Sequence, residues 1–164
     1  MAILKIKTST NLSRLIGDKL DSDVRKITRE WSTANAPKVI KYTKETISSG
    51  NSPVKGYKRF QDYSPSYKNA IRKGRYSRYS KRQRPVNLTL SGKMLRSFIS
   101  RMTKTGFSVY FTSELAKYHN VEGAGRSKVI RRILPTGNEK FKRAIMSNLE
   151  KDLKYRATRT FGKL

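Results

Sequence analysis

Apolar side chains recur every four residues near the end of the chain, and this spacing predicts an amphipathic helix. The residues are Phe141, Ile145, Leu149 and Leu153. Positions three or four apart lie on one face of a helix, which can then pack on a core. Thr136 and Glu139 fit a capping box, the usual signal for a helix start. We therefore expect a C-terminal helix over residues 136–158.

A second helical stripe occupies the first third of the chain. Its apolar positions are Leu12, Ile16, Leu20, Val24, Ile27 and Trp31. Thr10 or Asn11 is the expected N-cap. Pro37 either kinks this helix or lies in the first turn of a second one, so the helical region extends over 11–48. Residues 2–8 alternate loosely and could form a short strand or an arm.

The region 86–135 has the shorter period of β-structure. VNLTL at 86–90 and VIRRILP at 129–135 read as strands. Residues 97–103 and 107–112 read as a hairpin, in which Gly106 can adopt a positive φ. Between these, SGKML predicts a brief helix or strand start, ELAKYHN one or two helical turns, and VEGAGRS a glycine-containing loop. We expect a single α+β domain over 1–164, with a small antiparallel sheet between the two helical regions.

Residues 53–85 interrupt this pattern with a basic, tyrosine-rich segment. Between 68 and 85 it contains eight Lys or Arg and no carboxylate. It has no sustained apolar period, so we expect a long loop or arm with one helical turn around 66–72. Loops of this length in compact domains tend to be functional or disordered.

The whole chain shares this positive charge. Its 164 residues include 38 Lys or Arg against 11 Asp or Glu, for a net charge of +27. Solubility needs a net charge of only about 2 to 8 in a small domain, so the excess favours a polyanionic or acidic partner, with nucleic acid the default. No signal peptide is recognisable, and no stretch approaches the length of a membrane span.

The residues available for chemistry do not predict an enzyme. His119 is the only histidine and there is no cysteine, which leaves no set of metal ligands and makes any catalytic triad depend on one residue. Asp18, Asp21 and Asp23 are spaced poorly for a cation site. GAGR at 123–126 lacks the lysine and serine of a phosphate-binding loop. We expect no catalytic residue, no metal and no cofactor.

The basic segment is therefore the main candidate for contact with a partner. No zinc finger, RRM, KH or helix-turn-helix pattern is present, so we expect nonspecific contact with DNA or contact with an acidic protein. Arginine and lysine would bind phosphates, and interleaved tyrosines could stack on bases. The candidate contact residues are Arg72, Lys73, Arg75, Arg78, Lys81, Arg82 and Arg84.

Short motifs follow Val86: LTLSGKMLRSF, GFSVYFTSELAKYHNVEGAG and IRRILPTGNEKF. Together they resemble the pattern shared by neck, tail-completion and virion-morphogenesis proteins of tailed bacteriophages, over about residues 86–145. The chain departs from that pattern in its more basic segment 53–85, and in Asn120-Val121-Glu122, which lengthens the spacing before a glycine. The matching positions are Leu90, Ser91, Gly92, Met94, Leu95, Ala116, Tyr118, His119, Gly123, Arg131, Leu134 and Pro135.

The resemblance implies a structural, noncatalytic subunit of the virion, assembled in the host cytoplasm. It would form a homo-oligomeric ring, six-fold or twelve-fold, at the head–tail junction. This head–tail connector would join portal or adaptor proteins to tail proteins. Genomic DNA lies in or passes through the channel of such a ring, which gives the basic segment a nonspecific partner.

Two other functions explain parts of the sequence. A nonspecific nucleic-acid-binding protein, ribosomal or nucleoid-like, would account for the charge without the motifs. A nuclease or toxin that uses His119 with a nearby carboxylate is the third interpretation, and it rests on that one pair of groups.

Overall fold

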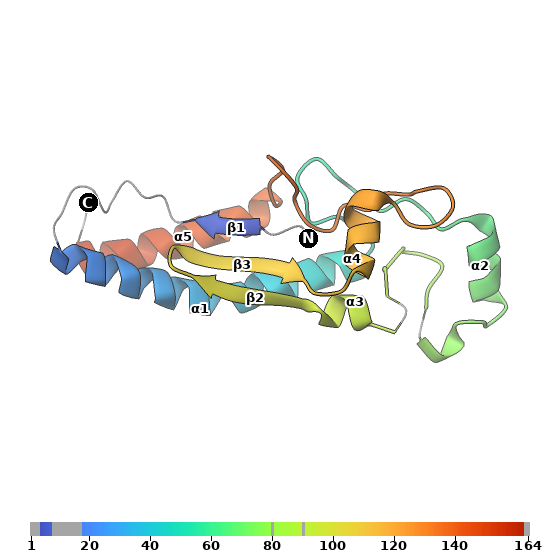
Figure 1. Ribbon diagram of the computed structural model, residues 1–164, viewed down its shortest axis with the longest axis horizontal. Helices are drawn as coiled ribbons and strands as arrows, with labels where there is room; N and C mark the ends of the chain where they lie inside the picture. The colour runs from blue at the N-terminus through green and yellow to red at the C-terminus, as the bar shows by residue number, and fades with distance from the viewer. Residues whose placement is uncertain (1–3, 8–17, 80, 90, 163–164) are drawn as a thin grey trace.

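Two long helices and a small antiparallel sheet make up most of the protein. The computed structural model describes residues 4–7, 18–79, 81–89 and 91–162, with only the backbone of 4–7 and 18–20. Helix α1 (Asp18–Ser48) and helix α5 (Arg143–Phe161) lie side by side along the long axis, and the sheet packs on α1 (Figure 1). The expected α+β class is confirmed.

Helix α1 continues through Pro37 as one element. Proline removes one backbone hydrogen bond from a helix interior, but Pro37 lies on the exposed side, where water can bind the carbonyl that is left free. A second helix starting at Pro37 is therefore wrong. The expected N-caps, Thr10 and Asn11, lie outside the described residues.

The sheet has the strand order β1–β3–β2, with both pairings antiparallel. Its strands are β1 (Leu4–Lys7), β2 (Phe98–Thr103) and β3 (Gly106–Phe111). The expected hairpin is confirmed, since Thr103 pairs with Gly106 across the two-residue turn Lys104–Thr105. Gly106 has φ 148, a value that L side chains rarely adopt. The expected strand at 2–8 is also present, as β1.

Five short helical segments complete the described elements. They are α2 (Pro65–Arg72), α3 (Lys93–Arg96), α4 (Leu115–Lys117) and a π-helical turn, Tyr118–Glu122, that continues α4, together with a 3₁₀ turn at Ser77–Tyr79. The helical turns expected within SGKML and ELAKYHN correspond to α3 and to α4 with its π-helical continuation.

The strands expected at 86–90 and 129–135 are wrong. Leu88 has a positive φ of 48, which interrupts an extended strand, and its side chain packs into the core. Residues 130–135 form no ladder with any described strand, although Ile133 and Leu134 are both buried. Residues 86–89 and 130–135 are irregular, and Val86, Leu88, Ile133 and Leu134 are buried in the core rather than in a sheet.

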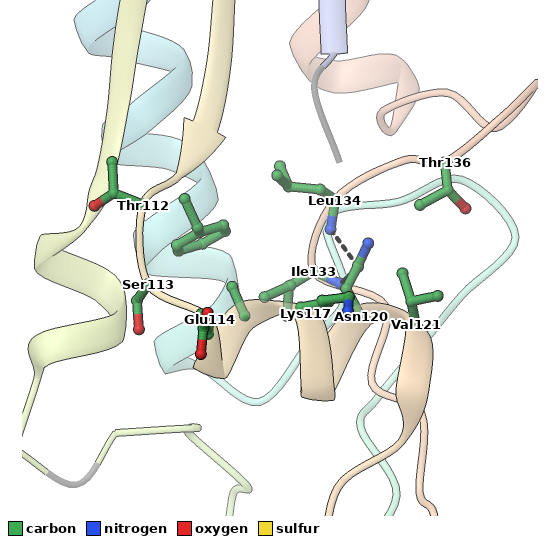
Figure 2. Close-up of a pocket in the computed structure, with 11 residues that line it drawn as sticks. Thr112, Ser113, Glu114, Lys117, Asn120, Val121, Ile133, Leu134 and Thr136 are labelled. Carbon is green, nitrogen blue, oxygen red and sulfur yellow. Dashed lines mark hydrogen bonds between the residues drawn. The ribbon is translucent and has the colours of Figure 1, made fainter. Parts of the chain in front are cut away.

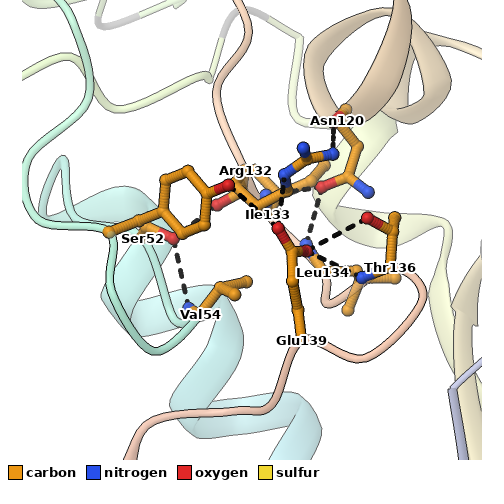
Figure 3. Close-up of polar contacts among 9 residues, drawn as sticks. Ser52, Val54, Asn120, Arg132, Ile133, Leu134, Thr136 and Glu139 are labelled. Atoms are coloured by element: carbon orange, nitrogen blue, oxygen red, sulfur yellow. Dashed lines mark hydrogen bonds and ion pairs between the residues drawn. The ribbon is translucent and has the colours of Figure 1, made fainter.

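Asn120 holds the segment 132–134 in place (Figure 3). Its side-chain oxygen accepts hydrogen bonds from the backbone N–H groups of Ile133 and Leu134, at 2.7 and 2.9 Å. Its backbone carbonyl accepts a third from Arg132, at 2.5 Å. The first two bonds occupy backbone N–H groups that a sheet would have used, so the chain stays irregular here. The third comes from the Arg132 side chain.

The C-terminal helix begins at Arg143, later than the expected residue 136. The Thr136–Glu139 pair does form, since the Glu139 carboxylate accepts from the backbone and hydroxyl of Thr136 (Figure 3). It closes a turn instead of a helix, because Phe141 is buried in an isolated β-bridge with Val54. The expected apolar face is confirmed, with Ile145 and Leu149 buried and Leu153 packed against the core.

The core centres on Trp31 of α1. Its indole nitrogen donates to the backbone carbonyl of Leu149 in α5 at 3.0 Å. Its ring lies 5.5 Å from that of Phe107 in β3. Nearby, Asn35 donates to the Asp152 carboxylate at 2.6 Å, which adds a polar link between the two long helices. Trp31 thus connects α1, α5 and the sheet.

Gly50, just after α1, is the closest packing point between that helix and residues 85–86. It has φ 83, and a Cβ placed there would lie 2.6 Å from the Cβ of Pro85. The Gly50 carbonyl also accepts a hydrogen bond from the backbone of Phe60, at 2.8 Å. Three stretches of chain meet at this glycine, so no larger residue fits.

We predict that Gly50→Ala lowers the free energy of unfolding by about 3 kcal/mol, because it adds a steric clash to the strain of a positive φ. Gly56→Ala is the matched control, since Gly56 has φ 91 and nothing within 4 Å of a Cβ. The control should lose about 1 kcal/mol, the cost of backbone strain alone. Denaturant unfolding measures both, and equal losses would show that packing at Gly50 has no part in stability.

Candidate nucleic-acid interface

The predicted contact residues lie on one loop at one end of the molecule. We call residues 64–84 the basic arm; it contains α2, which lies at the end opposite the start of α1 (Figure 1). The sequence predicted a longer arm, from 53. Residues 53–63 instead belong to the body, because Val54 is fully buried and Phe60 is 8% exposed.

The basic arm is a folded loop. Ser64 caps α2 by accepting a hydrogen bond from the backbone of Tyr67. The Tyr67 ring contacts Tyr63 at 5.0 Å and Tyr76 at 5.1 Å between ring centres. This row of three rings holds both sides of the arm against the body, and the predicted helical turn at 66–72 is confirmed as α2.

Five of the seven predicted contact residues are exposed on the basic arm and make no ion pair with another described residue. Two of them stack on a neighbouring tyrosine, with Arg75 5.9 Å from the Tyr76 ring centre and Arg78 4.6 Å from that of Tyr79. Stacking limits the freedom of a guanidinium while leaving its N–H groups exposed. The five residues are Arg72, Lys73, Arg75, Arg78 and Arg82.

Arg84, the sixth predicted contact residue, is exposed but paired. The Asp62 carboxylate accepts from Arg84 at 2.7 Å and from Lys68 at 2.6 Å. These two bonds hold the pKa of Asp62 below its usual range. They also tie the end of the basic arm and its first helix to Asp62 of the body, so Arg84 already has a structural partner.

Lys81, the seventh, points inward, unlike a surface contact. Its amine lies 4.8 Å from the centre of the Tyr63 ring and donates to the Asn87 side chain at 3.3 Å. Burial lowers the pKa of Lys81 to about 8, and the nearby charge of Arg131 contributes. The prediction from sequence treated all seven cations alike, whereas only the fold shows which of them turn inward.

Tyr63 lies among three basic side chains, which with it form what we call the Tyr63 cluster: Tyr63, Lys81, His119 and Arg131. The Arg131 guanidinium lies 5.5 Å from the Tyr63 ring centre. It is 6% exposed and donates to the backbone carbonyls of Gln61 and Asp62 at 3.1 to 3.3 Å. The backbone N–H of Arg131 also donates to the carbonyl of His119, at 2.7 Å.

Burial disfavours the charged forms of the side chains in this cluster, and repulsion between neighbouring cations adds to the effect. Burial lowers the pKa of His119 to about 4, with smaller contributions from the charges of Arg131 and Lys81. Burial also lowers the pKa of Arg131 and raises that of Tyr63 to about 12. At neutral pH His119 is therefore uncharged.

The residues of the family pattern occupy mostly structural positions. Gly92 precedes α3 with φ 75, and Leu95 packs against the core. Gly123 has φ 83, and a Cβ there would meet the carbonyl of Lys128 at 2.2 Å. Pro135 is buried, Tyr118 is 48% exposed, and Leu90 lies outside the described residues.

A separate pocket of about 600 Å³ lies beside α4 (Figure 2). Its lining is mainly apolar and includes Ala116, Val121 and Ile133, with Glu114 and Lys117 at its charged side. It contains neither His119 nor any of the predicted contact residues. The arrangement offers an apolar surface rather than a set of reactive groups.

Comparison with known proteins gave no relative. No family model matches the chain, and no curated protein or solved structure is significantly similar to it. No group of three potential metal ligands occurs among the described residues. None of the helices in the described ranges is long and apolar enough to cross a membrane.

Sequence reasoning did not identify the Tyr63 cluster as a group. Arg131 is 68 to 70 residues away from its partners near Tyr63, and His119 is 56 residues from Tyr63, so no local spacing joins them. Each residue was noticed for another reason: Tyr63 as part of the tyrosine-rich segment, and His119 and Arg131 as part of the family pattern.

We predict that the free energy of unfolding falls in acid because His119 is buried as a neutral base. The unfolded chain binds a proton at His119 near pH 6.5 and the folded chain only near pH 4, so stability falls as pH falls through this window. At about 1.36 kcal/mol per pKa unit, the full loss is roughly 3 kcal/mol. His119→Gln, which cannot titrate, should lose less stability between pH 6.5 and 4.

Chemical denaturation at several pH values measures this difference. Carboxylates such as Asp62 lose their contribution at lower pH and do so in both proteins, so they cancel in the comparison. Parallel stability curves for the wild type and His119→Gln would contradict the burial of His119 as a neutral base.

Proposed function

We propose that the chain is a structural subunit of a bacteriophage virion, a neck or tail-completion protein that forms a homo-oligomeric ring at the head–tail junction. The ring joins portal or adaptor proteins to the tail, and the basic arm faces the DNA in its channel. The observation that carries the DNA contact is the basic arm, which has no carboxylate and presents five exposed cations without an ion pair to another described residue, at one end of an elongated body.

The electrostatics of the arm support a nonspecific contact with DNA. Arginine and lysine bind backbone phosphates without reading the sequence. Arg75 and Arg78, held against tyrosine rings, present their N–H groups with less loss of side-chain freedom. The base-reading elements of the common DNA-binding motifs are missing from the sequence, which agrees with a partner that varies in sequence along the genome.

The sheet supports assembly into a ring. Its order β1–β3–β2 leaves two different strands, β1 and β2, with one unpaired edge each among the described residues. An open edge can pair with a strand of another chain, and contact between two different edges is heterologous. Heterologous contacts generate rings when the rotation closes. Six-fold or twelve-fold closure is part of the proposal.

A nonspecific nucleic-acid-binding protein, ribosomal or nucleoid-like, is the second candidate. The exposed Arg–Tyr stacks of the basic arm favour it directly, because aromatic rings and cations together suit single-stranded or duplex nucleic acid. It requires no ring, so the state of assembly separates the two candidates.

Electron microscopy of the purified protein is the first test. We expect closed rings of uniform subunit number, and a ring at the head–tail junction when virions that contain the protein are imaged. A protein that remains monomeric at high concentration and is missing from that junction would overturn the virion role and leave the second candidate.

The contribution of the arm is tested by the triple variant Arg75→Gln, Arg78→Gln, Arg82→Gln. We expect weaker DNA binding and a slope of log affinity against log salt that is smaller by about 2 to 3, since each phosphate contact contributes about 0.9. Fluorescence anisotropy with duplex DNA over a range of salt concentrations measures both.

The matched control removes three exposed cations elsewhere: Arg101→Gln, Lys104→Gln and Arg126→Gln. It lowers net charge by the same amount but leaves the basic arm unchanged. Its salt slope should stay within about 1 of the wild type. If both triple variants lose the same slope, binding follows total charge and the arm is not the interface.

A further inference from the structure

The Tyr63 cluster contains two cations, the partly buried Lys81 and the buried Arg131, but no anion. Among the described side chains, Lys81, His119 and Arg131 make no ion pair, although Asp62, the neighbour of Tyr63, makes two. Those two go to Lys68 and Arg84 instead. Buried charges in proteins are normally paired, so this cluster lacks the counter-charge that its surroundings call for.

The cluster also has donor capacity that the protein does not use. An ammonium group has three N–H donors, and within the part of the chain that the structure describes the Lys81 amine makes one long hydrogen bond, 3.3 Å, to Asn87. The Nδ1 atom of His119 is buried without a partner. The hydroxyl of Tyr63 is buried near the backbone of Leu88, without a hydrogen bond of ordinary geometry.

Arg131 differs from these groups because it is already fixed. Its Nε and Nη2 atoms donate to the carbonyls of Gln61 and Asp62, which hold the guanidinium against the Tyr63 ring. It provides a permanent positive charge in a defined position. Lys81, on the return side of the basic arm, provides a second charge on a longer and more adaptable side chain.

A phosphate group matches this combination. It carries negative charge and several acceptor oxygens, and charge-assisted hydrogen bonds to such oxygens are among the strongest in proteins. Oxyanion binding would pair the two cations and use the free donors together. We propose that Tyr63, Lys81, His119 and Arg131 form a binding site for one phosphate group, with Arg131 as the fixed cation and Lys81 as the adaptable donor.

The ionisation behaviour of the cluster agrees with this site. Burial, and the repulsion between neighbouring cations, depress the pKa of Lys81 to about 8. A bound anion offsets both effects and raises that pKa, so binding and protonation of Lys81 favour each other. His119 stays neutral and Arg131 stays charged through the neutral range, which leaves Lys81 as the group that titrates there.

Titration of the full-length protein with inorganic phosphate, followed by ³¹P NMR and calorimetry, tests the site. We expect saturable binding at one site, weakened about tenfold or more in Lys81→Met and retained in Lys81→Arg, which keeps the charge. Lys93→Met is the control, because Lys93 is exposed and makes no ion pair. Equal affinity in the wild type and Lys81→Met, or no saturable binding, would overturn the proposal.

The pH dependence gives a second readout that a purely structural lysine would not provide. Sulfate is the probe, because its charge is constant over the range. We expect sulfate affinity to fall between pH 7 and pH 9 in the wild type, as the free Lys81 amine loses its proton, and to stay level in Lys81→Met. The same decline in both proteins would show that Lys81 is not part of the site.

A DNA backbone and free phosphate would present the same chemistry to this site, and a competition experiment distinguishes these two sources. That DNA provides it, as a backbone phosphodiester, rests on the proposed function. In that case saturating duplex DNA displaces inorganic phosphate from the wild type; if free phosphate is the natural ligand, both remain bound together. The triple arm variant separates failures, because loss of DNA binding with phosphate binding intact would contradict the DNA interface and leave the phosphate site standing.

Discussion

The indole of Trp31 is the contact on which the arrangement of the larger elements depends. It belongs to α1, donates to a backbone carbonyl of α5 and packs on Phe107 of the sheet. A polar atom buried in this position needs its partner, since leaving it unpaired costs on the order of 1 to 3 kcal/mol. The spacing between the two long helices is therefore set by one hydrogen bond as well as by apolar packing. The small sheet has a defined packing position only because that spacing is fixed.

Local periodicity made part of this fold predictable. The two long helices and the hairpin are visible in the sequence because their apolar residues repeat with the period of the element. The segments 86–90 and 129–135 are equally apolar but are not strands. Their conformation is decided by the positive φ of Leu88 and by the Asn120 side chain, which binds backbone groups 13 and 14 residues further along. A single interaction between residues so far apart produces no periodic pattern in the sequence.

The composition of the candidate interface was predictable from the sequence, whereas the directions of its side chains were not. Basic residues at 68–85 are obvious in the sequence, but their directions follow from Tyr63 and Asp62. Tyr63 draws Lys81 inward, and Asp62 occupies Lys68 and Arg84. Arg131 approaches the same ring from a segment about 70 residues away. The cations available to a partner are those that make none of these internal contacts, and only the three-dimensional structure identifies them.

The crowded glycine at the end of α1 also has an evolutionary consequence. The chain leaves the body after Tyr63 and returns at Pro85, and Phe60 and Pro85, which flank this loop, both pack at Gly50. A loop whose two ends meet can change in length with little effect on the domain beneath it, because the entropy of closing a loop grows only slowly with its size. The residues between those points can therefore diverge, lengthen or be exchanged among related chains while the helices and sheet stay the same. The exposed surface of the arm can thus change without a change in the packing of the core.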